Sequence, residues 1–200
     1  SPRFIDLFAG IGGTRLSFEL EGFECVFSSE WDEYSRLTYA KNFGDLPSGD
    51  ITNIPASSIP DFETLVAGFP CQPFSSIGAR QGFSHPTQGT LFHEIVRILK
   101  EKRPPTVLLE NVRGLITHDG GRTLRIILDS LIQLGYSVSY EVLDSSEFGV
   151  PQKRQRVYLV GFLDETLGSG FAFPKPSLGD NDFSRFIEWG SSGYEITEHL

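Results

Sequence analysis

Short apolar runs alternate with segments of helical periodicity along the first 160 residues, and this alternation is the feature that most constrains the fold. Each apolar run is the length of one buried strand, and each periodic segment places its apolar residues on one face of a helix. We expect strands at residues 4–8, 25–29, 64–67, 106–110, 138–143 and 157–162, and helices at residues 14–21, 32–42, 90–102 and 123–134.

Such an alternation predicts an α/β fold with a parallel-rich sheet and helices on both faces. No helical segment separates residues 138–143 from residues 157–162, so these two strands are expected to close the sheet as a pair. The sheet is then mixed but mostly parallel. Ligands bind such sheets beyond the carboxyl ends of the strands, which is where the functional residues are expected.

The composition excludes several classes of protein. Two hundred residues suit one domain, and the longest apolar runs are too short to cross a membrane. The only cysteines, Cys25 and Cys71, are too few for a disulfide scaffold or a cysteine-rich metal site. We therefore expect a reducing, cytoplasmic setting, no membrane association and no metal.

The net charge of −9 argues against a nucleic-acid partner, but the charge is unevenly distributed. Residues 71–160 hold 11 Lys/Arg against 8 Asp/Glu, while the rest of the chain is strongly acidic. This middle segment is the part expected to face a polyanion. The indication is weak, because a small basic excess over ninety residues is common in soluble proteins.

A glycine cluster at residues 10–13 follows the first expected strand and opens the first expected helix. Such a turn lets the backbone approach a ligand closely, and the helix N-terminus attracts an anionic group. Glu30 follows the second strand, where an acidic side chain can bind ribose hydroxyls. A dinucleotide fingerprint would need glycine where Arg15 stands, so S-adenosylmethionine is favoured over a nicotinamide cofactor. Phe8 and Trp31 either sandwich an adenine ring or are ordinary core aromatics.

Cys71 lies in a segment framed by prolines. Pro70 and Pro73 prevent a regular helix or a central strand around this cysteine, so it is expected in a fixed loop at the end of a strand. A thiolate presented there can act as a nucleophile. Cys25, in contrast, is expected to be a small buried hydrophobe. The glycine-containing residues 75–89 then form a candidate lid.

Charged residues flank two later strands. Glu110 ends an apolar run and is either a surface acid or a general acid opposite the cysteine. Arg154 and Arg156 alternate before the last strand, so their side chains are expected on one side of an extended segment. The alternative is a solvated basic rim.

Four ordered motifs together resemble the cytosine-C5 DNA methyltransferases of bacterial restriction-modification systems, over about residues 4–176. They are Phe8-Ala9-Gly10-Ile11-Gly12-Gly13, Pro70-Cys71-Gln72-Pro73-Phe74-Ser75, Glu110-Asn111-Val112 and Gln152-Lys153-Arg154-Gln155-Arg156. The resemblance implies the Rossmann-like methyltransferase fold and double-stranded DNA as partner. It also implies a cofactor site for S-adenosylmethionine formed by Phe8, Gly10, Ile11, Gly12, Gly13, Glu30, Trp31, Asp50, Ile51, Gly68, Pro70 and Leu91.

The chemistry that this resemblance implies is transfer of a methyl group to C5 of a flipped-out cytosine. Cys71 would attack C6 of the base, and Glu110 would bind or protonate N3. Arg156, supported by Arg154, would hold O2. Asp50 and Ile51 would contact the adenine edge of the cofactor.

Two departures from the family pattern matter. Gln88 stands where many relatives have arginine, which puts one phosphate contact in doubt. We also expect a catalytic and cofactor-binding domain at residues 1–167 and an exit segment at residues 168–200, leading to a target-recognition region that the sequence lacks.

The chain is then either a methyltransferase, a fragment or split-enzyme subunit that needs a C-terminal partner, or an RNA-directed relative. A bacterial cytoplasmic protein that associates with the nucleoid when it acts is expected.

Overall fold

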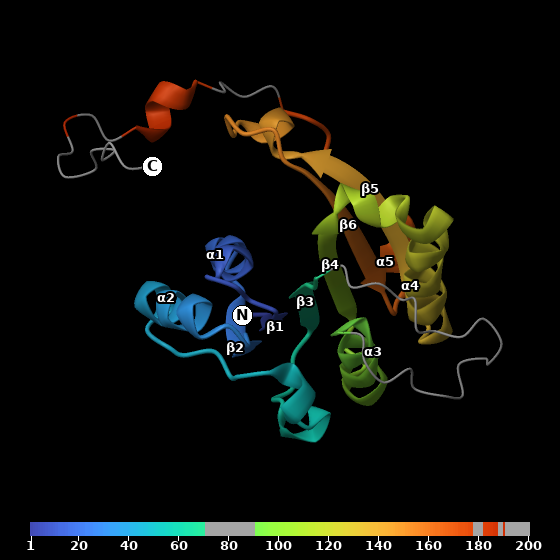
Figure 1. Cartoon of the computed structure of the whole chain (residues 1–200). Coiled ribbons are helices and arrows are strands. Elements are labelled where there is room, and N and C mark those ends of the chain that lie inside the picture. The colour runs from blue at the N-terminus through green and yellow to red at the C-terminus, as the bar shows by residue number, and fades with distance from the viewer. Residues whose placement is uncertain (71–90, 178–181, 188–189, 191–200) are drawn as a thin grey trace.

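The computed structural model describes residues 1–70, 91–177, 182–187 and 190. Its six strands form one sheet in the order β2-β1-β3-β4-β6-β5 (Figure 1). The strands are β1 (Arg3–Leu7), β2 (Glu24–Ser29), β3 (Thr64–Gly68), β4 (Thr106–Val112), β5 (Ser137–Asp144) and β6 (Gln155–Phe162). The helices are α1 (Gly13–Leu20), α2 (Glu33–Phe43), α3 (Leu91–Lys102), α4 (Arg122–Gln133) and α5 (Glu165–Gly170), with short 3-10 turns between some of them.

The sheet is mixed and mostly parallel, as the sequence predicts. Strands β2, β1, β3 and β4 run parallel to one another, and β6 is antiparallel to both β4 and β5. The expected closing pair is therefore confirmed. Strand β4 continues two residues beyond its expected end at Glu110, because Asn111 pairs with Val157 and Val112 with Arg156 on β6.

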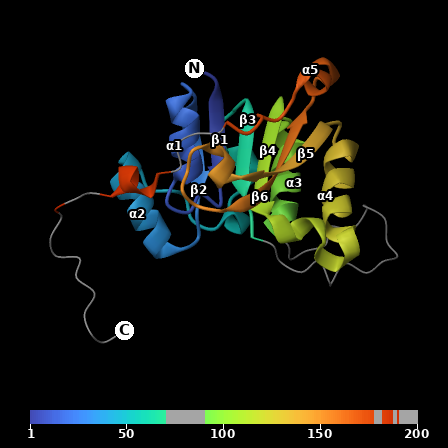
Figure 2. The same ribbon diagram turned by 90° about the horizontal axis from the view of Figure 1, so that it is seen from above.

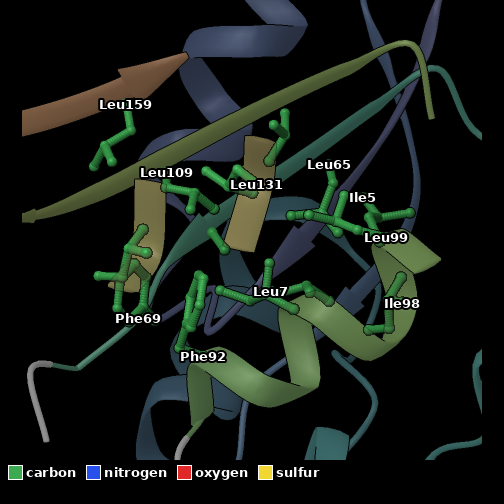
Figure 3. Packing of buried hydrophobic residues seen from close by; sticks show 14 of the residues in the cluster. Ile5, Leu7, Leu65, Phe69, Phe92, Ile98, Leu99, Leu109, Leu131 and Leu159 are labelled. Atoms are coloured by element: carbon green, nitrogen blue, oxygen red, sulfur yellow. The ribbon is translucent and has the colours of Figure 1, made fainter. Parts of the chain in front are cut away.

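Helices cover both faces of the sheet. Figures 1 and 2 show α1 and α2 on one side and α3 and α4 on the other. Figure 3 shows the core beneath α3, where strand residues such as Leu7, Leu65 and Leu109 meet Ile98 and Leu99. All five of these side chains are fully buried. Their alternation along the strands, with period two, is what places them on this face.

The opposite face is covered less completely. Phe4 packs there against Phe18 of α1, with ring centroids 4.9 Å apart. Next to these rings lies a groove of about 400 Å³. Its walls are almost entirely apolar and come from α1, from the strands β4 and β6 and from the segment that carries Phe171 and Phe173. The helix layer on this side is therefore incomplete within the described residues.

Two helix starts show how local sequence sets the fold. Asp32 caps α2, since its Oδ1 accepts a 2.8 Å hydrogen bond from the backbone N–H of Ser35. Gly12 precedes α1 with φ +94°. A Cβ at Gly12 would lie 2.0 Å from Cε2 of Phe43, so only glycine allows α1 and α2 to pack this closely.

Among the described residues, no helix is long and apolar enough to span a membrane. The same part of the chain contains no group of three or more His, Cys, Asp or Glu side chains suited to a metal ion. Cys25 is half-buried, and this burial raises the pKa of its thiol to about 11. The thiol therefore stays protonated at neutral pH, in agreement with its expected role in packing.

Candidate active site

A cavity of about 340 Å³ lies at the carboxyl edge of the sheet, between the ends of β1, β2 and β3 and the start of α3. This is the edge at which ligands of open α/β sheets bind. Seven of the twelve residues predicted for the cofactor line this cavity. They are Phe8, Glu30, Trp31, Asp50, Ile51, Pro70 and Leu91, and the other lining residues are Ser29 and Gly49.

Glu30 is the most firmly held acid of the cavity wall. Its side chain is buried, and both carboxylate oxygens accept backbone hydrogen bonds: Oε2 from Gly10 at 2.8 Å and Oε1 from Asp32 at 2.9 Å. Each carboxylate oxygen has a second lone pair with which it can accept a hydroxyl. Glu30 therefore links the glycine turn to the cavity and is suited to bind a ribose.

Two aromatic residues flank Glu30 on the wall of this cavity. Trp31 is 75 % exposed, which is unusual for an indole and argues against a role in the core. Phe8 has a φ of +57°, which a bulky residue rarely adopts. Backbone strain of this kind concentrates at ligand sites. The two rings are thus suited to enclose a planar group such as adenine.

Asp50 and Ile51 bring a polar and an apolar group to the same cavity. Asp50 is exposed, and its Oδ1 accepts a hydrogen bond from Thr52 at 2.9 Å, which starts a 3-10 turn at Ile51–Asn53. Ile51 is buried against the core. The turn fixes the carboxylate at the cavity wall, where it can accept a hydrogen bond from an exocyclic amine.

The remaining predicted cofactor residues do not line the described cavity. Gly10 acts through its hydrogen bond to Glu30, and Ile11 is 56 % exposed. Gly12 is explained by the Phe43 ring, which leaves no space for a Cβ there, whereas a Cβ at Gly13 would meet nothing within 4 Å. The role of these residues as direct cofactor contacts remains a prediction.

Glu110 and Arg156 form an ion pair at the same sheet edge, with 2.9 Å between Arg156 Nε and Glu110 Oε1. The pair spans two antiparallel strands, because Glu110 is opposite Tyr158 and Val112 is opposite Arg156. A methyl group on Gly68 would lie 3.5 Å from Glu110 Oε2, so Gly68 borders this acid rather than the cavity.

Arg154 and Arg156 both influence the pKa of the Tyr158 hydroxyl. Burial raises the pKa of the Tyr158 hydroxyl, the charge of Glu110 raises it further, and Arg154 and Arg156 oppose this shift. Both guanidinium charges therefore act on one phenol. That the two side chains lie on one side of the strand stays a prediction. Because Arg156 is engaged with Glu110, the basic rim is not simply solvated.

Asn111 holds the end of β3 in place. Its Nδ2 donates a buried 2.8 Å hydrogen bond to the carbonyl of Phe69, and its Oδ1 accepts one from the Val112 backbone. Phe69 is followed by Pro70, which lines the cavity. Cys71, the expected nucleophile, lies outside the described residues, as do Gln88 and the expected lid at residues 75–89.

Sequence reasoning missed Ser29, Gly49 and the anchoring function of Asn111. Ser29 is the last residue of β2, so it follows from the rule that strand ends carry ligands. Gly49 follows Ser48, whose single β-bridge to Ser29 no local pattern signals. Asn111 is part of the motif Glu110-Asn111-Val112, but its hydrogen bond to the Phe69 carbonyl depends on the pairing of β3 with β4. Nothing local in the sequence signals this bond.

The donor set fits a nucleoside-containing cofactor. The cavity combines two aromatic rings, Phe8 and Trp31, with two carboxylates, Glu30 and Asp50. Aromatic faces suit a base, and carboxylate oxygens suit the hydroxyls of a ribose and the amine of adenine. With acids on its wall, the cavity also tolerates a cationic ligand such as a sulfonium.

Comparison with known proteins agrees with this site. Residues 2–186 match the family model of C-5 cytosine-specific DNA methylases. The chain is 56 % identical over 198 residues to the type II methyltransferase M.MspI of Moraxella sp, covering 99 % of this chain and 47 % of the relative. It is 52 % identical to M.BsuFI of Bacillus subtilis over 98 % of this chain and 48 % of that relative. The chain thus spans about half the length of these curated relatives.

Solved structures agree with the fold. A putative DNA modification methyltransferase from an E. coli prophage is similar with a TM-score of 0.68 and 21 % identity, over 90 % of this chain and 52 % of that one. A DNMT2 mutant of Spodoptera frugiperda is similar with a TM-score of 0.67 and 24 % identity, over 81 % and 50 % of the two chains. The six-stranded sheet is therefore a Rossmann-like methyltransferase fold. Given the match over residues 2–186, the chain belongs to the C-5 cytosine-specific DNA methylase family.

Proposed function

We propose that this chain is the cofactor-binding and catalytic part of a type II DNA (cytosine-5-)-methyltransferase. The observation that carries the proposal is the meeting of two sites at one sheet edge. The cavity bounded by Glu30 and Pro70 lies at the ends of β1, β2 and β3, and the Glu110–Arg156 pair lies at the end of β4 beside them. We assign the cavity to the methyl donor and the ion pair to the target base.

S-adenosylmethionine, when bound, supplies an electrophilic methyl group. We assign its adenine to the space between Phe8 and Trp31, its ribose to Glu30 and its adenine amine to Asp50. The burial of Glu30 and its two backbone hydrogen bonds support this assignment, since they hold the carboxylate ready before a ligand arrives.

Cytosine C5 is too weak a nucleophile to accept a methyl group directly, so the base itself must be activated. We assign this step to Cys71, whose thiolate adds to C6 and forms a new carbon–sulfur bond. Glu110 binds or protonates N3, and C5 becomes the nucleophilic carbon of an enamine. After methylation, loss of the C5 proton expels the thiolate.

Arg156 has two tasks in this scheme. It is held against Glu110 Oε1, and its remaining guanidinium N–H groups can bind O2 of the base, with Arg154 in support. A cytosine inside a duplex cannot reach these groups, so the target base must leave the helix. Double-stranded DNA is therefore the proposed substrate.

A covalent adduct tests this function. DNA with 5-fluorocytosine at the target site cannot lose a proton from C5, so the thiolate stays bound after methyl transfer. We expect a protein–DNA adduct that Cys71→Ser abolishes and that Cys25→Ser, the matched control at the other cysteine, leaves intact. An adduct that persists in Cys71→Ser would contradict the nucleophile.

Because the chain spans about half of its curated relatives, a second candidate is a subunit that needs the rest of the protein for turnover. In this scheme residues 1–167 form the catalytic domain, and residues 168–200 lead toward the target-recognition region. We then expect no methyl transfer from the chain alone and transfer after addition of the C-terminal half of a relative. Turnover by the chain alone would contradict the split. An RNA-directed enzyme is tested in the same assay with tRNA in place of DNA.

A further inference from the structure

Asp50 and Ile51 reach the cavity from a segment that lies outside the sheet. The chain between α2 and β3 consists of loops and short 3-10 turns, and the turn Ile51–Asn53 carries both residues at its start. A single β-bridge between Ser48 and Ser29 joins this segment to β2, just before Asp50. Ile51 is buried in the core, but apolar packing is non-directional and does not set the orientation of the turn. The position of the Asp50 carboxylate therefore depends on a further, directional contact.

Arg97 of α3 supplies this contact. Its Nη2 donates hydrogen bonds to the backbone carbonyl oxygens of Ile51, at 3.1 Å, and Ile54, at 2.9 Å. Ile51 begins the 3-10 turn and Ile54 directly follows it, so the two bonds hold both ends. Because Nη2 carries two N–H groups in the fixed plane of the guanidinium, each carbonyl can receive one of them. The turn is thus fixed in distance and in angle relative to α3.

Glu94 orients the Arg97 guanidinium from the same helix. Arg97 Nε donates a 2.8 Å hydrogen bond to Glu94 Oε2, three residues earlier on α3. This ion pair is partly buried, with the Arg97 side chain 35 % exposed and the Glu94 side chain 21 % exposed. The acid compensates the charge of Arg97, and Arg97 does not line the described cavity. The guanidinium therefore acts on the backbone of the turn and not on a ligand.

Helix α3 is a firm support for such a contact. Its inner face packs into the core through side chains such as Ile95 and Ile98, which are fully buried. The first residue of the helix, Leu91, itself lines the cavity. Arg97 consequently sets the position of Asp50 relative to the same rigid element that forms another part of the cavity wall.

We propose that Arg97 is a positioning residue of the cofactor site, whose guanidinium holds the Ile51–Asn53 turn and thereby sets where the Asp50 carboxylate meets the adenine amine. This inference rests on the proposed assignment of that amine to Asp50. A hydrogen bond weakens steeply as its distance and angle depart from the ideal, so a displaced carboxylate recognises the amine poorly. Loss of Arg97 should therefore impair recognition of the amine in particular, and not cofactor binding as a whole.

The test is calorimetric titration of the chain with two ligands, S-adenosylhomocysteine and its inosine counterpart, in which a carbonyl oxygen replaces the adenine amine. The ratio of the two affinities measures recognition of the amine, and it does not depend on the fraction of the protein that is folded. We expect the wild type to prefer S-adenosylhomocysteine by roughly tenfold or more, as for a hydrogen bond to a charged group. Arg97→Ala should reduce this preference to roughly twofold and bind the inosine ligand about as well as the wild type does.

Three further variants complete the test. Arg97→Lys keeps the charge but lacks the planar guanidinium, so its preference should lie between those of Arg97→Ala and the wild type, and it serves as the test if Arg97→Ala does not fold. Glu94→Gln keeps an acceptor for Arg97 Nε and should retain the wild-type preference within roughly twofold. Arg122→Ala is the matched control, because Arg122 forms the same kind of ion pair, with Asp119 three residues earlier, at the start of α4. Thermal unfolding without ligand verifies that each variant is folded.

The outcomes separate the two proposals. Failure of the wild type to bind S-adenosylhomocysteine would contradict the cofactor site, and with it the function of Arg97. Equal binding of the two ligands by the wild type would contradict the assignment of Asp50 and the positioning function, but not the cofactor site. If Arg97→Ala binds both ligands more weakly and keeps the wild-type preference, Arg97 only stabilises the fold and does not position Asp50. A preference in Glu94→Gln as low as that of Arg97→Ala would assign the effect to the ion pair, which also contradicts the proposal.

Discussion

The backbone N–H of Gly10 lies 2.8 Å from Glu30 Oε2, and this hydrogen bond joins the glycine turn after β1 to the acid at the end of β2. The two residues are twenty positions apart in the sequence and come together because β1 and β2 are parallel neighbours. Glu30 thus has two functions: it organises the turn, and it presents a carboxylate to the cavity.

Replacement of Glu30 with glutamine should weaken cofactor binding by about tenfold or more. The amide keeps one acceptor oxygen but turns an NH₂ group toward one of the two backbone donors, and a lost hydrogen bond to a charged group is worth about 1.5–3 kcal/mol. Calorimetric titration with S-adenosylhomocysteine measures the change. Glu33→Gln, an exposed neighbour at the start of α2, is the control. Equal affinities of Glu30→Gln and the wild type would exclude Glu30 from the site.

Replacement of Gly12 with alanine should destabilise the fold by about 1–3 kcal/mol or more. The new Cβ meets the Phe43 ring, and φ +94° is unfavourable for any L side chain. Urea unfolding followed by circular dichroism gives the free energy of unfolding. Gly13→Ala is the matched control, because that position has open space and should stay close to the wild type. If both variants unfold at the same urea concentration, the packing of α1 on α2 is not the reason for Gly12.

Asn111→Ala should cost about 1–3 kcal/mol of unfolding free energy, because it leaves the buried Phe69 carbonyl without its partner. Asn42→Ala removes the same kind of bond, from Asn42 Nδ2 to the Ile11 carbonyl, at an exposed position. Water replaces that bond, so the control should lose at most about 0.5 kcal/mol. Thermal unfolding compares the two variants. A larger loss in Asn42→Ala would show that the Asn111 bond does not secure the end of β3.

Asp6 also makes stability depend on pH. Burial raises its pKa from 3.8 to about 7, so the folded chain binds the proton more tightly than the unfolded chain. The resulting stabilisation is complete below about pH 4, decreases as the pH rises and is lost above about pH 7. Asp6→Asn cannot titrate at this position. The unfolding free energy of the variant relative to that of the wild type should therefore increase between about pH 4 and pH 7. Urea unfolding at several pH values measures this difference, and a constant difference would refute the raised pKa.

The local signals in the sequence predict much of the fold. Apolar runs, helical periodicity and the Asp32 cap are encoded within a few residues, and the expected strands and helices are present near their expected bounds. The strand-end rule places Glu30 and Pro70 at one edge, and both line the same cavity. Asp50 also lines it, but only the family resemblance implied this residue.

The features that could not be predicted depend on partners distant in the sequence. Strand β4 extends to Val112 because β6 pairs with it. Asp6 lies in an otherwise apolar strand, and the burial that raises its pKa comes from elements that pack around β1. Gly68 borders Glu110, on the adjacent strand, and does not line the cavity. Each of these contacts follows from the register of the sheet, which no local pattern encodes.

The Glu110–Arg156 pair has a consequence for how the family can vary. The geometry of the pair is set by the hydrogen-bonded ladder between β4 and β6. The connection between these two strands contains α4 and β5. The length of the loops in this connection does not set the distance between the two charges. Insertions, deletions or a break in the loops that join α4 and β5 to each other and to these strands should thus be tolerated in evolution or engineering, provided that both strands keep their register.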